Sequence, residues 1–149
     1  MVRIMNNPRL PKFERDSAYK KRGGTAGWLL LKCGVCRIEQ MFYQKDGQGN
    51  LFRLYLDRIT SSDGQRPLSN LNIDNIRALN CLSCEKIIGV PMVYKKDERP
   101  RVAIRLVESG VIKQIIHNWQ EWESINPIDV TVTLKSMILP EQPQHKEAP

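Results

Sequence analysis

The sequence contains two short cysteine pairs, Cys33-Gly34-Val35-Cys36 and Cys81-Leu82-Ser83-Cys84, and no other cysteine. Two cysteines at this spacing can point at one metal ion from a tight turn, and two such pairs supply the four thiolates of a tetrahedral structural Zn²⁺ site. Residues 37–80 separate the pairs, which is enough chain for a small sheet. We therefore predict that the fold is organised around one structural zinc ion, with these ligands: Cys33, Cys36, Cys81 and Cys84.

Other uses of the cysteines fit the sequence less well. Two disulfides need an oxidising compartment, and the early basic residues Arg3, Arg9 and Lys12, with no apolar segment behind them, do not resemble a signal peptide. A redox motif accounts for one Cys-x-x-Cys but not for a second, while an iron–sulfur or other soft-metal site stays open as an alternative. The usual zinc-knuckle pattern has a glycine after the second cysteine, where this chain has Arg37 and Glu85.

The charge of the chain is uneven. Lys and Arg total 23 against 16 acidic residues, for a net charge of +7, and residues 1–24 hold seven basic residues against two acidic ones. With its prolines and the pair Gly23-Gly24, this segment predicts a flexible arm that ends in a glycine hinge. Such an arm, including Lys20, Lys21 and Arg22, attracts polyanions such as nucleic acid in a salt-dependent way. A solvated tail is the alternative.

Residues 25–139 predict one mainly β domain. Short apolar or alternating segments, which are typical of strands, occur at 26–32, 37–44, 51–59, 87–94, 102–107, 111–116 and 128–139. Asp46-Gly47 predicts a tight reversal into the return strand 51–59. In that strand, alternation places four side chains on one face, which is predicted to lie mostly in the core: Phe52, Leu54, Leu56 and Arg58.

Three further segments complete the prediction. Residues 73–79 fit either a helical turn or a strand, and Pro91 predicts an edge strand or a bulge. The proline-rich residues 140–149 predict a disordered tail. The doubled cysteine turn indicates two strand–turn–strand halves joined by one ion, so the predicted fold class is mainly β, with antiparallel sheets joined at a Cys₄ zinc site, as in an elaborated zinc ribbon.

This layout resembles the β-tent zinc domain, which Yippee-type proteins, the thalidomide-binding domain of cereblon and the B-type methionine sulfoxide reductases share. Besides the cysteines, the resemblance rests on Ile88-Gly89-Val90, on Tyr94 and on the strand from Val102 to Glu108, and it covers about residues 26–117. It implies two antiparallel sheets that meet at the zinc. It does not imply reductase activity, because that chemistry needs a cysteine beyond the zinc ligands.

Neither of two more specific resemblances supplies a function. Cereblon-type domains bind their ligand in a cage of tryptophans, and Trp28, Trp119 and Trp122 do not fall at matching positions. The segments 43–47 and 56–59 also look like small uncharacterised prokaryotic zinc-knuckle proteins, for which no activity follows.

Two groups of residues predict binding surfaces. Five basic residues surround one predicted hairpin and are candidates for phosphate contacts: Lys95, Lys96, Arg99, Arg101 and Arg105. Because Asp97 and Glu98 lie among them, a solvated turn is the alternative. Trp119 and Trp122 are three residues apart and share a face of a helical turn, which predicts either a partner or ligand surface or a part of the core.

The sequence favours binding over catalysis. A Cys₄ zinc site is coordinatively closed and cannot activate water, and His117 has no second histidine near it in the sequence. We therefore predict a non-catalytic, zinc-stabilised module that binds nucleic acid. The alternatives are a protein-interaction or small-ligand adaptor and, third, an enzyme. No apolar stretch is long enough to cross a membrane, and the cytoplasm, or the nucleus of a eukaryote, is the expected location.

Overall fold

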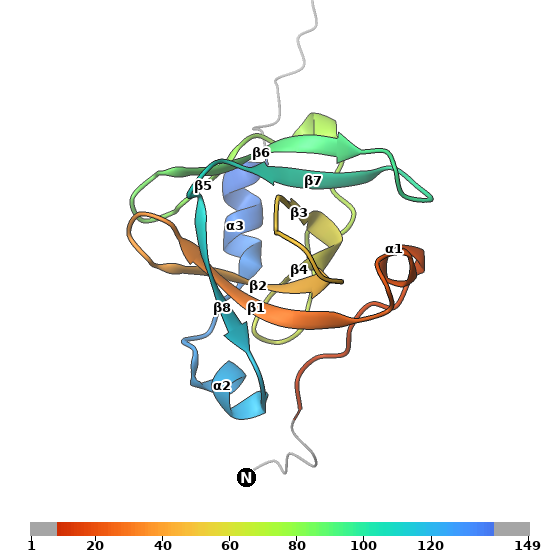
Figure 1. Cartoon of the computed structure of the whole chain (residues 1–149). Helices are drawn as coiled ribbons and strands as arrows, with labels where there is room; N and C mark the ends of the chain where they lie inside the picture. Colours follow the sequence, from red (N-terminus) through yellow and green to blue (C-terminus); the bar gives the residue numbers. More distant parts are fainter. Residues whose placement is uncertain (1–8, 139–149) are drawn as a thin grey trace, which may run out of the picture.

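The computed structural model describes residues 9–138, which form a mainly β domain of two four-stranded antiparallel sheets (Figure 1). The strands are β1 (Ala26–Cys33), β2 (Glu39–Asp46), β3 (Arg53–Tyr55), β4 (Ile59–Thr60), β5 (Leu79–Asn80), β6 (Ile87–Tyr94), β7 (Arg101–Leu106) and β8 (Val111–Ile116). The helices are α1 (Ser17–Lys21), α2 (Trp119–Ser124), α3 (Val130–Met137) and two 3₁₀ turns, η1 (Leu56–Arg58) and η2 (Ile73–Asn75).

Each sheet contains one of the two cysteine turns. The first sheet has the strand order β4-β2-β1-β8, and the first cysteine turn joins its neighbouring strands β1 and β2. The second sheet has the order β3-β7-β6-β5, and the second cysteine turn joins β5 and β6. The predicted pair of strand–turn–strand halves is therefore confirmed. β8 follows β7 in the chain but pairs with β1 of the first sheet, so the β7–β8 turn also crosses between the sheets.

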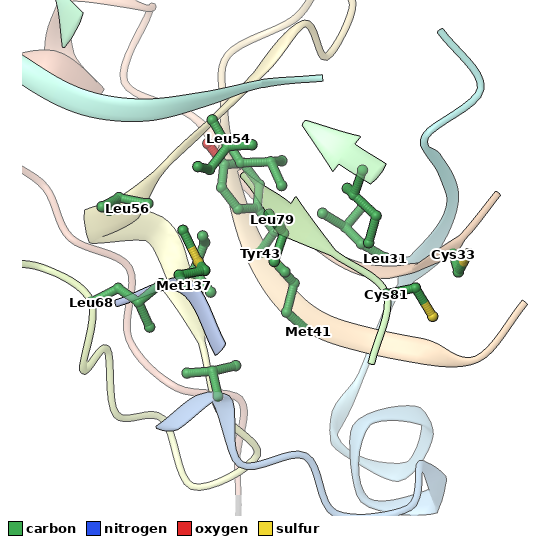
Figure 2. Packing of buried hydrophobic residues seen from close by; sticks show 14 of the residues in the cluster. Leu31, Cys33, Met41, Tyr43, Leu54, Leu56, Leu68, Leu79, Cys81 and Met137 are labelled. Carbon is green, nitrogen blue, oxygen red and sulfur yellow. The ribbon is translucent and has the colours of Figure 1, made fainter. Parts of the chain in front are cut away.

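The main core fills the space between the sheets (Figure 2). Leu31 and Tyr43 of the first sheet meet Leu54 and Leu79 of the second there, and Cys33 and Cys81 lie at one edge of the same cluster. In Figure 1 α3 stands between the two sheets. A second cluster covers the other face of the first sheet, with these members: Trp28, Leu30, Phe42, Ile116 and Trp122.

The predicted return strand 51–59 is wrong in its extent and its pairing. Arg53–Tyr55 pair with β7 in the second sheet, whereas Ile59–Thr60 pair with β2 in the first. The 3₁₀ turn η1 lies between them, so it carries the chain from one sheet to the other. Phe52 precedes β3 and is exposed, which corrects its assignment to the core, while Leu54, Leu56 and Arg58 are buried as predicted.

The strand predicted at 128–139 is a helix over its described part. Asp129 caps α3 by accepting a hydrogen bond from the backbone N–H of Thr131. The buried residues Val130, Thr133 and Met137 are spaced three and four apart, which is the helical period. The β-branched residues of this segment favour a strand locally, but burial of one helical face outweighs that preference.

The two ambiguous segments are resolved. Residues 73–79 supply both alternatives, because the 3₁₀ turn η2 is followed by the short strand β5. β5 pairs with β6 only at Leu79↔Gly89 and Asn80↔Ile87. Pro91 lies beyond that pairing, where none of the described strands flanks the second edge of β6, so a proline without an N–H is accommodated there. Across the described part of the chain, no helix is both long and apolar enough to cross a membrane.

Residues 9–24 lie against the domain, which corrects the predicted flexible arm over this range. The backbone N–H of Glu14 donates to the side chain of Gln44, which donates back to the Glu14 carbonyl. Phe13 stacks on Trp28 with ring centroids 5.3 Å apart, and Asp16 caps α1. Residues 1–8 of the arm and the predicted tail 140–149 lie outside the described residues.

Candidate metal centre and charged surfaces

The four cysteines meet at one point between the sheets. Their sulfur atoms all lie within 4.8 Å of one another, and the Cys33–Cys84 and Cys36–Cys81 sulfur pairs are each 3.6 Å apart. In a tetrahedral site with metal–sulfur bonds of about 2.3 Å, neighbouring sulfurs are about 3.8 Å apart. All four cysteines are free of disulfides. The cluster therefore has the donor type, number and spacing to hold one metal ion.

The two cysteine turns have the same backbone conformation. In the first turn, the N–H of Cys33 donates to the Ile38 carbonyl and the N–H of Arg37 donates to the Cys33 carbonyl. In the second turn, the N–H of Cys81 donates to the Lys86 carbonyl and the N–H of Glu85 donates to the Cys81 carbonyl. Arg37 and Glu85 both have φ of +67°. These are the positions at which the usual pattern has glycine, because a residue without Cβ adopts this conformation at no steric cost.

Hydrogen bonds to sulfur favour ionised thiols at the centre. Burial opposes ionisation of Cys81, but the backbone N–H groups of Cys84 and Ser83 outweigh it and lower the pKa of the thiol to about 6. The amide of Gln40 also donates to the Cys81 sulfur, at 3.4 Å. By contrast, the N–H of Ile38 favours the Cys36 thiolate, yet burial and the neighbouring thiols raise the pKa of Cys36 to about 11. Protons therefore hold part of the cluster neutral, and a bound cation would displace them.

The first cysteine turn packs against the β7–β8 turn through Gly34. The N–H of Gly34 donates to the Gly110 carbonyl at 2.9 Å. A Cβ atom at Gly34 would lie 1.8 Å from the Ser109 carbonyl oxygen, so only glycine fits. The equivalent position of the second turn is Leu82, which is exposed.

No protein-family model, curated protein or solved structure matches this chain. Any functional conclusion therefore depends on the residues themselves.

The structure brings the two predicted basic segments together at Asp97. This carboxylate, which is 3% exposed, accepts hydrogen bonds from Lys21 and Arg22 at the end of α1 and from Arg101 at the start of β7. In Figure 1 α1 accordingly lies beside the β6–β7 hairpin. The three cations lower the pKa of Asp97 by more than its burial raises it. A single buried acid thus joins segments that are about 75 residues apart.

Arginine and tyrosine side chains alternate on the outer face of the second sheet. Arg101 lies 3.8 Å from the centre of the Tyr55 ring, and Arg53 lies 4.5 Å from the centre of the Tyr94 ring. The two rings meet edge to face at 5.6 Å, and Arg22 donates to the Tyr55 hydroxyl. Strand register places Arg53 directly opposite Arg105. Sequence analysis singled out Arg22, Arg101 and Arg105, and missed Arg53, Tyr55 and Tyr94, although alternation along β3 does place Arg53 and Tyr55 on one face.

The other predicted basic residues stay on the surface around this group. Lys20, Lys95, Lys96, Arg99 and Arg105 are all exposed. Lys21, Arg22 and Arg101 form ion pairs with Asp97, which partly neutralises their charge. The uncompensated positive charge of this surface therefore comes mainly from the five exposed side chains just named.

The predicted partner surface at the tryptophans is corrected. Trp122 is 2% exposed, stacks on Phe42 with ring centroids 3.6 Å apart and donates its indole N–H to the Ser62 carbonyl. It is a core residue. Trp119 lies on the same helix α2 and packs partly buried against the same cluster. His117 is exposed and contacts Glu121 at 3.1 Å.

Arg58 organises a buried ion cluster. Its guanidinium is 1% exposed and contacts Asp16 at 2.8 Å, Asp46 at 2.9 Å and Asp57 at 3.5 Å. Asp57 in turn accepts from Arg101 at 2.6 Å. These contacts form a network that joins the N-terminal segment to both sheets.

Proposed function

We propose that the four cysteines hold one structural Zn²⁺ ion and that the domain it stabilises binds nucleic acid without catalysing a reaction. The thiolate donor set favours Zn²⁺ over harder cations, and four protein ligands leave no open position for water or substrate. The clustered free thiols also favour a reducing compartment, the cytoplasm or a nucleus. Two antiparallel sheets around a Cys₄ site are what the β-tent resemblance implies, and we extend that resemblance to fold alone.

The observation that carries the nucleic-acid proposal is the union of α1 and the β6–β7 hairpin at Asp97. Phosphate backbones are bound by clustered Lys and Arg, and the electrostatic part of the affinity needs no base contacts. Lys20 comes from α1, and Lys95, Lys96 and Arg99 come from the hairpin, so one surface collects charge from both segments.

The outer face of the second sheet supports single-stranded nucleic acid as the partner. Aromatic rings and guanidinium planes are the groups on which unpaired bases stack, at about 1–3 kcal/mol per base. Tyr94 and Arg53 form such a stacked pair at a half-buried position. Arg53 and Arg105, opposite each other on neighbouring strands, repel, and a phosphate between them would relieve that repulsion.

The proposal is tested by fluorescence anisotropy of a labelled single-stranded oligonucleotide across a salt series. We expect binding at low salt that weakens as salt rises. Replacing Lys95 and Lys96 together by glutamine removes two phosphate contacts and reduces the slope of log affinity against log salt by about 1.4 for a single strand. Tyr94→Ala reduces affinity by about tenfold with no change in slope, because stacking is not ionic.

The matched control removes equal charge elsewhere. Lys113 on β8 and Lys135 on α3 are exposed and lie outside this surface, and their joint replacement by glutamine should lower the affinity less than that of Lys95 and Lys96. Absence of binding at low salt, or equal losses from the two double variants, contradicts the proposed interface.

A protein-interaction role is the second candidate, and a different observation favours it. Four large apolar side chains in and next to the cysteine turns are exposed: Val35, Ile38, Leu82 and Ile87. Exposed apolar residues gathered at one site mark interaction surfaces more often than isolated ones do. Replacing Val35 and Leu82 by serine should then abolish binding of a protein partner and leave oligonucleotide affinity unchanged.

A further inference from the structure

One cavity lies away from the metal centre and borders the proposed nucleic-acid surface, with which it shares Arg99. Its volume is about 610 Å³, and it opens between α1, the 64–71 loop and the end of the β6–β7 hairpin. Small-molecule sites commonly have volumes of about 300–1,000 Å³. The lining is mostly polar and includes three arginines with buried side chains: Arg58, Arg66 and Arg101.

These three arginines differ in how well their charge is compensated. Arg58 contacts three carboxylates, and Arg101 contacts Asp57 and Asp97 at 2.6 Å and 2.9 Å. Among residues 9–138, the one carboxylate in ion-pair contact with Arg66 is Glu14, at 3.8 Å, and about half of the Glu14 side chain is exposed to water; Asp57 and Asp46 act on Arg66 from farther away. Arg66 is therefore the weakly compensated member of the group.

The remaining contacts of Arg66 do not replace an anion. One terminal nitrogen donates to the Lys12 carbonyl at 3.0 Å and to the Gln44 amide oxygen at 3.3 Å, which are both neutral acceptors, and the guanidinium lies 5.7 Å from the centre of the Trp28 ring. Its Nε, like that of Arg101, is buried without a hydrogen-bond partner, and only 14% of the Arg66 side chain is exposed. Burial lowers the pKa of Arg66, with Glu14 as the main opposing charge, whereas the pKa values of Arg58 and Arg101 are raised.

We propose that this cavity binds the phosphate or carboxylate group of a small polar molecule at Arg66, and that Glu14 competes with that group for the guanidinium. A buried guanidinium with an incomplete set of partners gains a charge-assisted hydrogen bond from such an anion. An incoming anion can displace the long, weak contact to Glu14 at the lowest free-energy cost, because the Glu14 side chain can rotate so that its carboxylate is hydrated by solvent.

The rest of the lining restricts the ligand. The cavity also presents carboxylates, among them Asp16, Asp57 and Glu98, which accept hydrogen bonds and repel additional negative charge. A suitable ligand therefore carries one anionic group for Arg66 and hydroxyl or amino donors elsewhere, as sugar phosphates and amino acids do. A polyphosphate or a long nucleic acid does not suit a lining of this sign.

The test is calorimetric titration of the metal-loaded full chain, in buffer without phosphate, with three probes: inorganic phosphate, acetate and ribose 5-phosphate. We expect ribose 5-phosphate to bind one to one and more tightly than inorganic phosphate. Binding of acetate in place of both phosphates would identify the anion as a carboxylate. No heat of binding with any of the three probes overturns the proposal.

Two substitutions with opposite expected effects assign the site. Glu14→Gln removes the competing carboxylate and should tighten binding by about fivefold, whereas Arg66→Gln should weaken it by at least about tenfold. A folding defect cannot produce the gain from Glu14→Gln, and thermal unfolding and metal content verify that Arg66→Gln is folded. Unchanged affinity in both variants overturns the assignment to Arg66.

A competition experiment separates this site from the nucleic-acid surface. A saturating single-stranded oligonucleotide should still allow ribose 5-phosphate to bind, because the proposed nucleic-acid surface shares Arg99 with the cavity lining but does not include Arg66. Full displacement of the sugar phosphate by the oligonucleotide would show one shared phosphate site and would overturn the separate small-molecule site.

Discussion

The Gly34→Ala substitution tests whether the first cysteine turn is held by its contact with the β7–β8 turn. The added Cβ would lie 1.8 Å from the Ser109 carbonyl oxygen and 2.9 Å from the Ser109 carbonyl carbon. Both are backbone atoms, so no change of rotamer relieves the overlap. The β7–β8 turn cannot retreat easily, because the N–H of Val107 donates to the Ile88 carbonyl on β6 and Gly110 is buried.

The magnitude follows from what has to move. Overpacking a close contact costs about 1–3 kcal/mol, and loss of the 2.9 Å hydrogen bond from Gly34 to Gly110 adds about 1 kcal/mol. We therefore expect the free energy of unfolding to fall by about 2–4 kcal/mol. In a domain of this size the melting temperature then falls by about 5–15 °C. Displacement of Cys33 and Cys36 should also speed metal release to a chromophoric chelator.

The measurement is urea unfolding of the metal-loaded protein, and the chain supplies its own control. Leu82 occupies the equivalent position of the second turn and is exposed. Leu82→Ala should change the free energy of unfolding by no more than about 0.5 kcal/mol. If Gly34→Ala is as stable as Leu82→Ala, the packing of the first turn against Ser109 is not the constraint that we describe.

Three other perturbations address the metal and the buried ions. Chelation should abolish cooperative thermal unfolding and weaken oligonucleotide binding, since a structural zinc site contributes about as much free energy as a whole domain has; a chelated chain that unfolds cooperatively at the same temperature argues against this. Arg58→Met leaves Asp46 buried without its partner and should cost about 3–5 kcal/mol in urea unfolding, while Asp57→Asn, at a third-exposed carboxylate, should cost far less. Burial opposes ionisation of Asp16, but hydrogen bonds from Arg58 and the Tyr19 N–H lower its pKa to about 2. Its contribution is therefore present above about pH 4 and lost as pH falls toward 2, so the stability difference between wild type and Asp16→Asn should vanish over that window.

The ligand set and the strands next to it could be predicted because their signals are local. A few neighbouring residues are enough to predict a metal-binding turn from the Cys-x-x-Cys spacing, and to predict strands from the apolar segments around β1, β6 and β7. The helix α3 was mispredicted because Val130, Thr131 and Val132 favour strands, while the helical spacing of Val130, Thr133 and Met137 becomes decisive only when one face is buried.

The charged surfaces were harder to predict because their contacts are long-range. Asp97 looks like one acid in a basic turn, and only the fold brings Lys21 and Arg22 to it. Likewise, no local pattern shows that Arg66 has its weak carboxylate partner in Glu14, more than fifty residues earlier in the chain. Sequence indicates which groups carry charge, whereas compensation of that charge depends on tertiary structure.

Strand β6 links the metal centre to the proposed nucleic-acid surface. It begins three residues after Cys84 and ends at Tyr94, and its eight residues span about 23 Å at the usual rise per residue. Among the strands of residues 9–138, β6 pairs with β5 at two positions and otherwise with β7. Loss of the metal would free the start of β6 and the first cysteine turn, which contacts the β7–β8 turn through Gly34 and Gly110. Both strands of the β6–β7 hairpin would then lose a stabilising contact at the same end. The cysteine cluster would therefore affect whether Tyr94 and the hairpin lysines are positioned to bind nucleic acid, although it does not contact the nucleic acid itself.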